Sequence, residues 1–217
     1  MRALWAIVGK DLRVEGRARE LFPAMSILAL ILLTAASAAG LARPTAPALL
    51  WLSILLATAL GLGRSFHHET DQDQIQGLRM APIDPALIYL GKALANLVVV
   101  LWVEVITVGA SAVFFNLDLG PSAGPLAVVF ALGTIGMVGL GTVLAAMLAT
   151  ARLREALLPL LLVPLSVPAV VAAVGATGKV LAGQPLSAAG GELQLLAAFA
   201  LLFFAAPVVV FEYVLEE

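Results

Sequence analysis

The chain contains no cysteine and only two histidines among its 217 residues. Without cysteine it can form neither a disulfide, nor a thiolate metal site, nor a covalent haem attachment of the C-x-x-C-H kind. Charged residues make up 12% of the chain, whereas soluble domains carry about 25%. The net charge of −2 gives no reason to expect nucleic-acid binding. The first 20 residues are too charged to supply the apolar core of a signal peptide, so we expect no cleavable signal.

Hydrophobic residues make up 62% of the sequence and are arranged in long runs. Runs of about 20 apolar residues indicate membrane-spanning helices rather than a water-soluble core. We therefore predict an all-α integral membrane protein in which residues 21–217 form one transmembrane domain, preceded by a separate N-terminal segment, 1–20. The six predicted spans are residues 21–42, 47–63, 93–115, 125–150, 155–177 and 193–214.

Lysine and arginine gather on one side of this predicted topology. Ten of the twelve lie in the N-terminal segment, in the loop 64–92 or between the fourth and fifth spans, whereas only Arg43 and Lys179 lie on the other side. Because cytoplasmic loops carry the excess of basic residues, we predict that both termini and the loop 64–92 are cytoplasmic. The opposite segments, "NLDLGPSAG" and "GKVLAGQPLSAAGGE", are expected to be short turns. No internal repeat of the kind found in many secondary transporters is apparent.

The N-terminal segment is too polar to span a membrane, but it is amphipathic. Its large apolar residues share one side of a helix, and Lys10, Arg13 and Arg17 share the other. This pattern is typical of a helix in the membrane interface, with Trp5 at headgroup depth and the bases facing water or anionic lipid. Asp11 intrudes on the apolar side. Two interpretations stay open: a charged flank that only sets topology, or a docking helix that braces a cytoplasmic partner.

The longest polar stretch, "RSFHHETDQDQIQGLRMAPIDP" (64–85), lies between the second and third spans. Its first part can form a short helix with a small apolar ridge, until Pro82 disfavours helix. A new helix is predicted to begin near Asp84 and Pro85, because these residue types suit an N-cap and a first turn. The stretch is either a partner-binding helix or a solvated loop. Adjacent His67 and His68 would point about 100° apart on a helix, so they do not predict a metal site.

Residues 66–98, "FHHETDQDQIQGLRMAPIDPALIYLGKALANLV", resemble the signature loop of the heme exporter protein B family. That family supplies the membrane permease of the ABC transporter used in cytochrome c maturation. A second similar block, 152–174, reproduces the proline-punctuated fifth span of the family. The positions that carry the resemblance are Phe66, Glu69, Ile75-Gln76, Pro82, Gly91-Lys92, Pro159, Pro164 and Pro168.

The resemblance implies an ABC-2-type permease architecture with an interfacial N-terminal helix and a cytoplasmic coupling helix. It implies two permease copies paired with two copies of a separate ABC ATPase in the bacterial inner membrane. It also implies a haem-handling membrane protein, a small single-span protein and a periplasmic haem chaperone. The chain has no G-x-x-x-x-G-K-[ST] phosphate loop, so it is not expected to be an enzyme, and ATP would act through the partner. The residues expected to couple to the ATPase are Phe66, Glu69, Asp71, Asp73, Ile75, Gln76, Leu78 and Pro82.

The spans themselves contain one acid and few haem ligands. Glu104 lies in the middle of the third span, where an unpaired acid is costly. It is either a functional residue or a packing residue bonded to Ser111, Thr134 or Thr142. Glycines at 133, 136, 139 and 141 predict close helix packing in the fourth span.

Haem would be a substrate rather than a firmly bound cofactor. No span contains histidine, and the only methionines in the spans are Met25, Met137 and Met147. We expect the chain to couple ATP hydrolysis to haem export, or to haem delivery and release by the chaperone. The alternatives are an ABC-2-type permease for a lipid-linked glycan or drug, and a coupling subunit that transports nothing.

Overall fold

The computed structural model describes residues 2–18, 21–41, 43–65, 85–148, 151 and 153–207. Every regular element in this part of the chain is helical, which confirms the all-α prediction. Six of these helical segments are long and apolar enough to cross a membrane. The longer helices are α1 (Arg2–Ala18), α2 (Leu21–Ala38), α3 (Ala46–Ser65), α6 (Pro85–Phe114), α7 (Ala123–Met147), α8 (Arg154–Leu181) and α9 (Gly190–Ala200). The short ones are the 3₁₀ turns η1 (Arg43–Thr45) and η2 (Leu186–Ala189) and the π-helix η3 (Leu201–Ala205).

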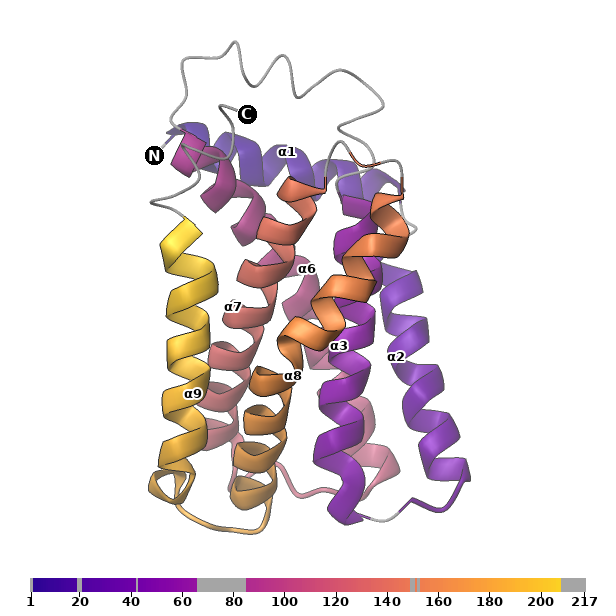
Figure 1. Cartoon of the computed structure of the whole chain (residues 1–217). Helices are drawn as coiled ribbons and strands as arrows, with labels where there is room; N and C mark the ends of the chain where they lie inside the picture. Colours follow the sequence, from indigo (N-terminus) through magenta and orange to yellow (C-terminus); the bar gives the residue numbers. More distant parts are fainter. Residues whose placement is uncertain are drawn as a thin grey trace.

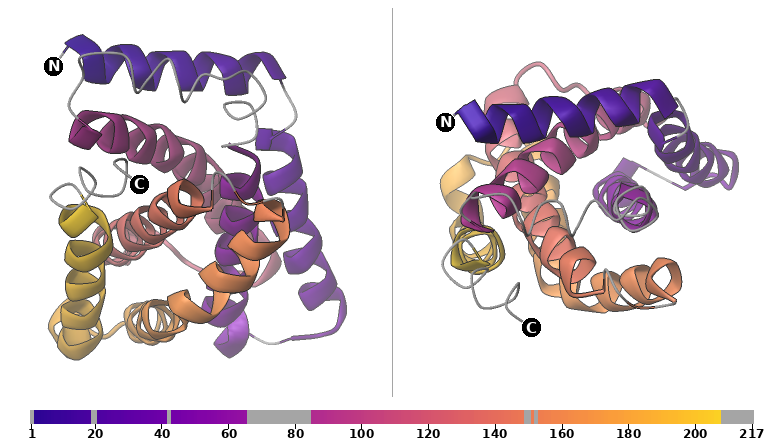
Figure 2. Two further views of the ribbon diagram at one scale, coloured as in Figure 1. Left: turned by 45° about the horizontal axis from the view of Figure 1, so that its top comes forward. Right: turned by 90° about the horizontal axis from the view of Figure 1, so that it is seen from above.

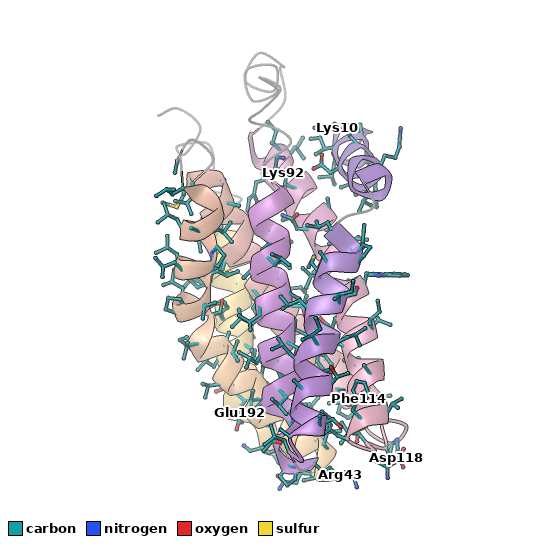
Figure 3. All side chains as sticks on the ribbon, turned by 90° about the vertical axis from the view of Figure 1, so that its right-hand side faces the viewer. Lys10, Arg43, Lys92, Phe114, Asp118 and Glu192 are labelled. Atoms are coloured by element: carbon teal, nitrogen blue, oxygen red, sulfur yellow. The ribbon has the colours of Figure 1, made fainter. Side chains whose placement is uncertain are left out.

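Six helices form an upright bundle, and α1 lies across one end of it (Figures 1 and 2). α2 and α9 stand at opposite edges of the bundle, while α3 packs against α2, α6, α7 and α8. Figure 3 shows Lys10 and Lys92 at the end covered by α1, and Arg43, Asp118 and Glu192 at the other. Lys179 lies at this second end too, because its ammonium is bonded to the Glu192 carboxylate. Arg43 and Lys179, the two basic residues that the sequence assigned to the outer side, therefore both lie at the end opposite α1.

Trp51, in the second turn of α3, is fully buried in the core. Its indole ring is stacked on Phe130 with a centroid distance of 5.1 Å, and its N–H donates to the Thr177 hydroxyl at 2.9 Å. The ring fits because α7 carries glycine where it passes: a Cβ at Gly133 would lie 2.5 Å from the ring. Trp51 thus ties α3 to α7 and α8, as expected for a buried Trp whose polar atom has a partner.

The outer surface of the bundle is apolar. Large side chains are exposed on α2, for example Ile27 and Ile31, and on α6, for example Trp102 and Val105. A soluble monomer rarely exposes apolar surface on this scale. The distribution agrees with a multi-pass membrane protein whose helices face lipid.

The helix ends follow local signals that hydropathy does not register. α2 ends at Ala38 rather than at residue 42, because Gly40 adopts φ 73° and closes a Schellman motif: Gly40 N–H donates to Ser37 and Leu41 N–H to Ala36. α8 runs on to Leu181 rather than ending at residue 177, and Gly183, with φ 78°, ends it in the same way.

Charged residues are paired within the fold near two helix ends. α6 begins at Pro85, where a helix was predicted to begin, and the turns before residue 93 carry Lys92, which is only 9% exposed beside Asp11. The outer segment 178–192 is mostly helical rather than a turn. It contains the end of α8, η2 and the start of α9, with Lys179 bonded to Glu192 at 2.5 Å.

Candidate functional site

The predicted coupling residues lie outside the described part of the chain. They are Phe66, Glu69, Asp71, Asp73, Ile75, Gln76, Leu78 and Pro82. The helices on either side of them are described: α3 ends at Ser65, and α6 begins at Pro85. Both of these points lie at the end of the bundle that α1 covers (Figure 1). The role of the coupling residues stays a prediction.

The first turns of α6 form the platform on which α1 packs. A Cβ at Gly91 would lie 2.7 Å from the Ile7 side chain, so only glycine lets the two helices approach this closely. Beside it, the Lys92 ammonium lies 4.0 Å from the Asp11 carboxylate. Asp11, which intrudes on the apolar side of α1, therefore faces a basic partner on α6. The pair Gly91-Lys92, singled out by the sequence resemblance, has a structural role in docking α1.

Several other side chains of α1 are exposed. Trp5 is 67% exposed, and Lys10 and Arg13 are exposed as well. Lys10 also lies 3.5 Å from Asp11, so part of its charge is balanced within the helix. Arg17 belongs to α1, but its side chain lies outside the described residues. An exposed tryptophan next to exposed bases is the arrangement that suits a lipid headgroup region.

A second contact of α6 holds the π-helix η3. The buried Tyr89 hydroxyl donates to the Phe203 carbonyl at 3.0 Å. From α7, Gly139 approaches so closely that a Cβ there would lie 2.5 Å from the same carbonyl oxygen and 2.9 Å from the Phe204 Cα. The glycine spacing predicts a packing role for Gly139, whereas a role for Tyr89 was not predicted. The sequence offered one signal for a buried contact at Tyr89: an aromatic residue that carries a hydroxyl group, in the second turn of a predicted helix.

Glu104 is buried between α6 and α7. Its Oε2 accepts a hydrogen bond from the Thr134 hydroxyl. The other two candidate partners are engaged elsewhere. The Ser111 hydroxyl donates to the Val108 carbonyl, and the Thr142 hydroxyl donates to its own helix and accepts from Asn96 at 3.1 Å. Thr134 is thus the candidate that the fold brings to the acid, and the two residues join neighbouring helices.

The three prolines lie inside α8. Pro164 and Pro168 are exposed and Pro159 is partly buried. The helix continues through all three positions, although each proline removes a backbone donor, and it changes direction along its length (Figure 1). The prolines therefore accompany a bend without interrupting the span.

The methionines in the spans do not converge on a common site. Met25 is fully buried, and its thioether packs over Gly61 of α3. Met137 belongs to the same core, while Met147 is 64% exposed at the end of α7. Within the described residues, no three His, Cys, Asp or Glu side chains come close enough together to hold a metal ion.

The chain is similar to known proteins along nearly its whole length. Residues 2–212 match the family model described as CcmB protein. The sequence is also 27% identical over 207 residues to the Heme exporter protein B of Bradyrhizobium diazoefficiens. That alignment covers 93% of this chain and 92% of the relative.

Proposed function

Because this chain belongs to the CcmB protein family, we propose that it is the permease subunit of an ABC transporter complex for cytochrome c maturation. The observation that carries the proposal is the family match over residues 2–212, which includes both α1 and the polar segment between α3 and α6. The similarity to a Heme exporter protein B makes haem the proposed cargo of the complex. The complex sits in the bacterial inner membrane, with both chain termini in the cytoplasm.

ATP hydrolysis takes place in a separate ABC ATPase, because this sequence has no phosphate loop. The segment 66–84 is the coupling element on which the ATPase docks. Its position supports this role: it joins α3, which packs against four other long helices, to the turn of α6 that holds α1 and η3. A displacement of the segment would therefore act directly on the centre of the bundle.

The haem is held by a partner membrane protein rather than by the spans of this chain. Axial haem ligands are usually histidine, cysteine, methionine or tyrosine. Met25 and Met137 are used in core packing, and Tyr89 already donates to Phe203. The chain thus passes ATP-driven movement to the partner, and delivery or release by a periplasmic haem chaperone completes the cycle. A second permease copy and a small single-span protein are the other proposed subunits, and lipid headgroups contact Trp5.

Glu104 contributes to packing between α6 and α7, and Pro159, Pro164 and Pro168 set the shape of α8. The hydrogen bond from Thr134 supports the first assignment, and the continuous helix supports the second.

Charge reversal in the polar segment tests the docking of the ATPase. The double substitution Glu69→Lys with Asp71→Lys is expected to weaken binding of the ATPase by roughly ten-fold or more, because complementary charge pairs are replaced by repulsion. Binding is measured with the purified subunits in lipid nanodiscs. The matched control is Asp118→Lys, a reversal in the exposed turn at the opposite end, which is expected to leave the affinity unchanged. Equal affinities for the wild type and the double variant would show that the segment is not the coupling element.

The absence of histidine and cysteine from the spans favours one alternative, an ABC-2-type permease for another substrate such as a lipid-linked glycan or drug. Affinity purification of the tagged chain from its native membrane separates the two proposals. Recovery of an ABC ATPase together with a haem-binding membrane protein supports the proposed function. Recovery of the ATPase alone favours the alternative. ATP-dependent haem flux in liposomes that contain only this chain and the ATPase would contradict the assignment of haem to a partner.

A further inference from the structure

The start of α6 contacts two elements on opposite sides. Gly91 and Lys92 face α1, whereas Tyr89 faces η3. Gly91 lies about 200° around the helix from Tyr89, so the close contact with Ile7 of α1 and the bond to η3 are on nearly opposite sides of the same helical turn. The long Lys92 side chain reaches Asp11 of α1 from a position only about 60° from Tyr89. This turn closely follows the polar segment 66–84 along the chain. A movement of that segment would therefore reach this turn of α6 early. Through the contacts of the turn with α1 and η3, it would pass on to other described parts of the bundle.

The element that Tyr89 holds differs from the rest of the bundle. In η3 the N–H of Ala206 donates to Leu201, five residues back, whereas at Leu201 itself the N–H still donates to Ala197 and Ala198. π-turns are rare, occur mostly as single turns inside α-helices and are frequent at functional sites. A π-turn contains one residue more than an α-turn, so its conversion would rotate the adjoining helix by about 100°. The π-turn seen here and an α-turn are two discrete hydrogen-bond arrangements that a helical segment can adopt.

Two close contacts from other helices meet η3 at Phe203 and Phe204. The Tyr89 hydroxyl bonds the Phe203 carbonyl, and its ring meets the Phe204 ring edge-on with a centroid distance of 6.4 Å. On the other side, Gly139 leaves room for the backbone at Phe203 and Phe204. Of these two contacts, only the one from Tyr89 comes from the helix that follows the polar segment.

We propose that Tyr89 is a positioning residue that transmits displacement of the start of α6 to the sixth span by holding the Phe203 carbonyl of η3. The proposal rests on the proposed function, because the ATPase supplies the displacement. A shift of Tyr89 moves or releases this carbonyl, and η3 responds by changing its hydrogen-bond spacing. An element whose two arrangements are biased by both sites is the physical basis on which coupling between distant sites can be argued.

Hydrogen–deuterium exchange on the complete complex with its ATPase in nanodiscs tests the inference. In the wild type, nucleotide binding is expected to change exchange at least three-fold both at residues 85–92 and at residues 199–207. In Tyr89→Phe, residues 85–92 should still respond, while the response of residues 199–207 is lost. Basal exchange of residues 199–207 should also rise about five-fold, which corresponds to the loss of one hydrogen bond of about 1 kcal/mol.

The matched control is Thr107→Val, which removes a buried hydroxyl from the same helix. The Thr107 hydroxyl donates to the Val103 carbonyl within α6, so its loss should leave the response of residues 199–207 intact. A nucleotide response of residues 199–207 that survives in Tyr89→Phe would overturn the inference. A wild type in which residues 85–92 respond and 199–207 do not would overturn it too, with the proposed function unaffected. A chain that binds no ABC ATPase at all would overturn the proposed function and the inference together.

Discussion

Gly139→Ala is expected to lower the free energy of unfolding by about 1–3 kcal/mol, the range for overpacking a closely packed interior. The added Cβ would lie 2.5 Å from the carbonyl oxygen of Phe203 and 2.9 Å from the Cα of Phe204. These are backbone atoms, so no side-chain rotation can relieve the clash. Relief would require α7 and η3 to separate, which would also stretch the bond from Tyr89 to Phe203.

The measurement is unfolding of the purified protein in detergent, with Gly109→Ala as the control. Gly109 lies in α6 and is exposed, and no neighbouring atom lies within 4 Å of the position that a Cβ would occupy there. Alanine is the better helix former, so the control should be neutral or stabilised by up to about 1 kcal/mol. If Gly139→Ala is as stable as Gly109→Ala, the close contact between α7 and η3 does not exist in the folded protein.

Glu104→Lys is expected to cost about 3 kcal/mol or more, the penalty for a lysine at the centre of a span. No other charged residue occurs between Lys92 and Asp118 or between Asp118 and Arg152, so neither α6 nor α7 offers the ammonium a counter-ion at that depth. A buried charge without a partner is strongly destabilising. The present carboxyl group instead has a specific partner, the Thr134 hydroxyl.

Glu104→Gln is the matched control, because its amide oxygen can accept the same hydrogen bond. We expect its stability to lie within about 1 kcal/mol of the wild type. Thr134→Val should cost about 1 kcal/mol by removing the donor. The measurement is unfolding of the wild type and of the three variants in detergent. A Gln variant as unstable as the Lys variant would show that the acid is retained for its charge and not for helix packing.

The start of α6 could be predicted from the sequence because its cause is local: Pro85 fixes the backbone angle that a first helical turn needs, and the structure begins α6 there. The ends of α2 and α8 were not predicted, because hydropathy does not register that Gly40 and Gly183 adopt a backbone conformation that other residues disfavour. The apolar runs placed the six spans because a bilayer requires about 20 such residues in succession.

The contacts between distant segments could not be predicted, because they depend on how the helices are aligned in space. The position of Asp11 on the apolar side of α1 is explained by Lys92 of α6, which lies beside it. Three hydroxyls were equal candidates for Glu104, and only the register of α6 against α7 selects Thr134. The bond from Tyr89 to Phe203 joins residues 114 positions apart and depends on a π-turn that no composition pattern signals.

The central claim is that the chain is required for cytochrome c maturation. It is tested most directly by measuring covalently bound haem in membranes from cells that lack this chain. We predict that haem staining of denatured c-type cytochromes is lost and that non-covalent b-type haem remains. The wild-type chain should restore the staining, and the Glu69→Lys with Asp71→Lys variant should not. Wild-type levels of c-type cytochromes in cells without the chain would contradict the proposed function.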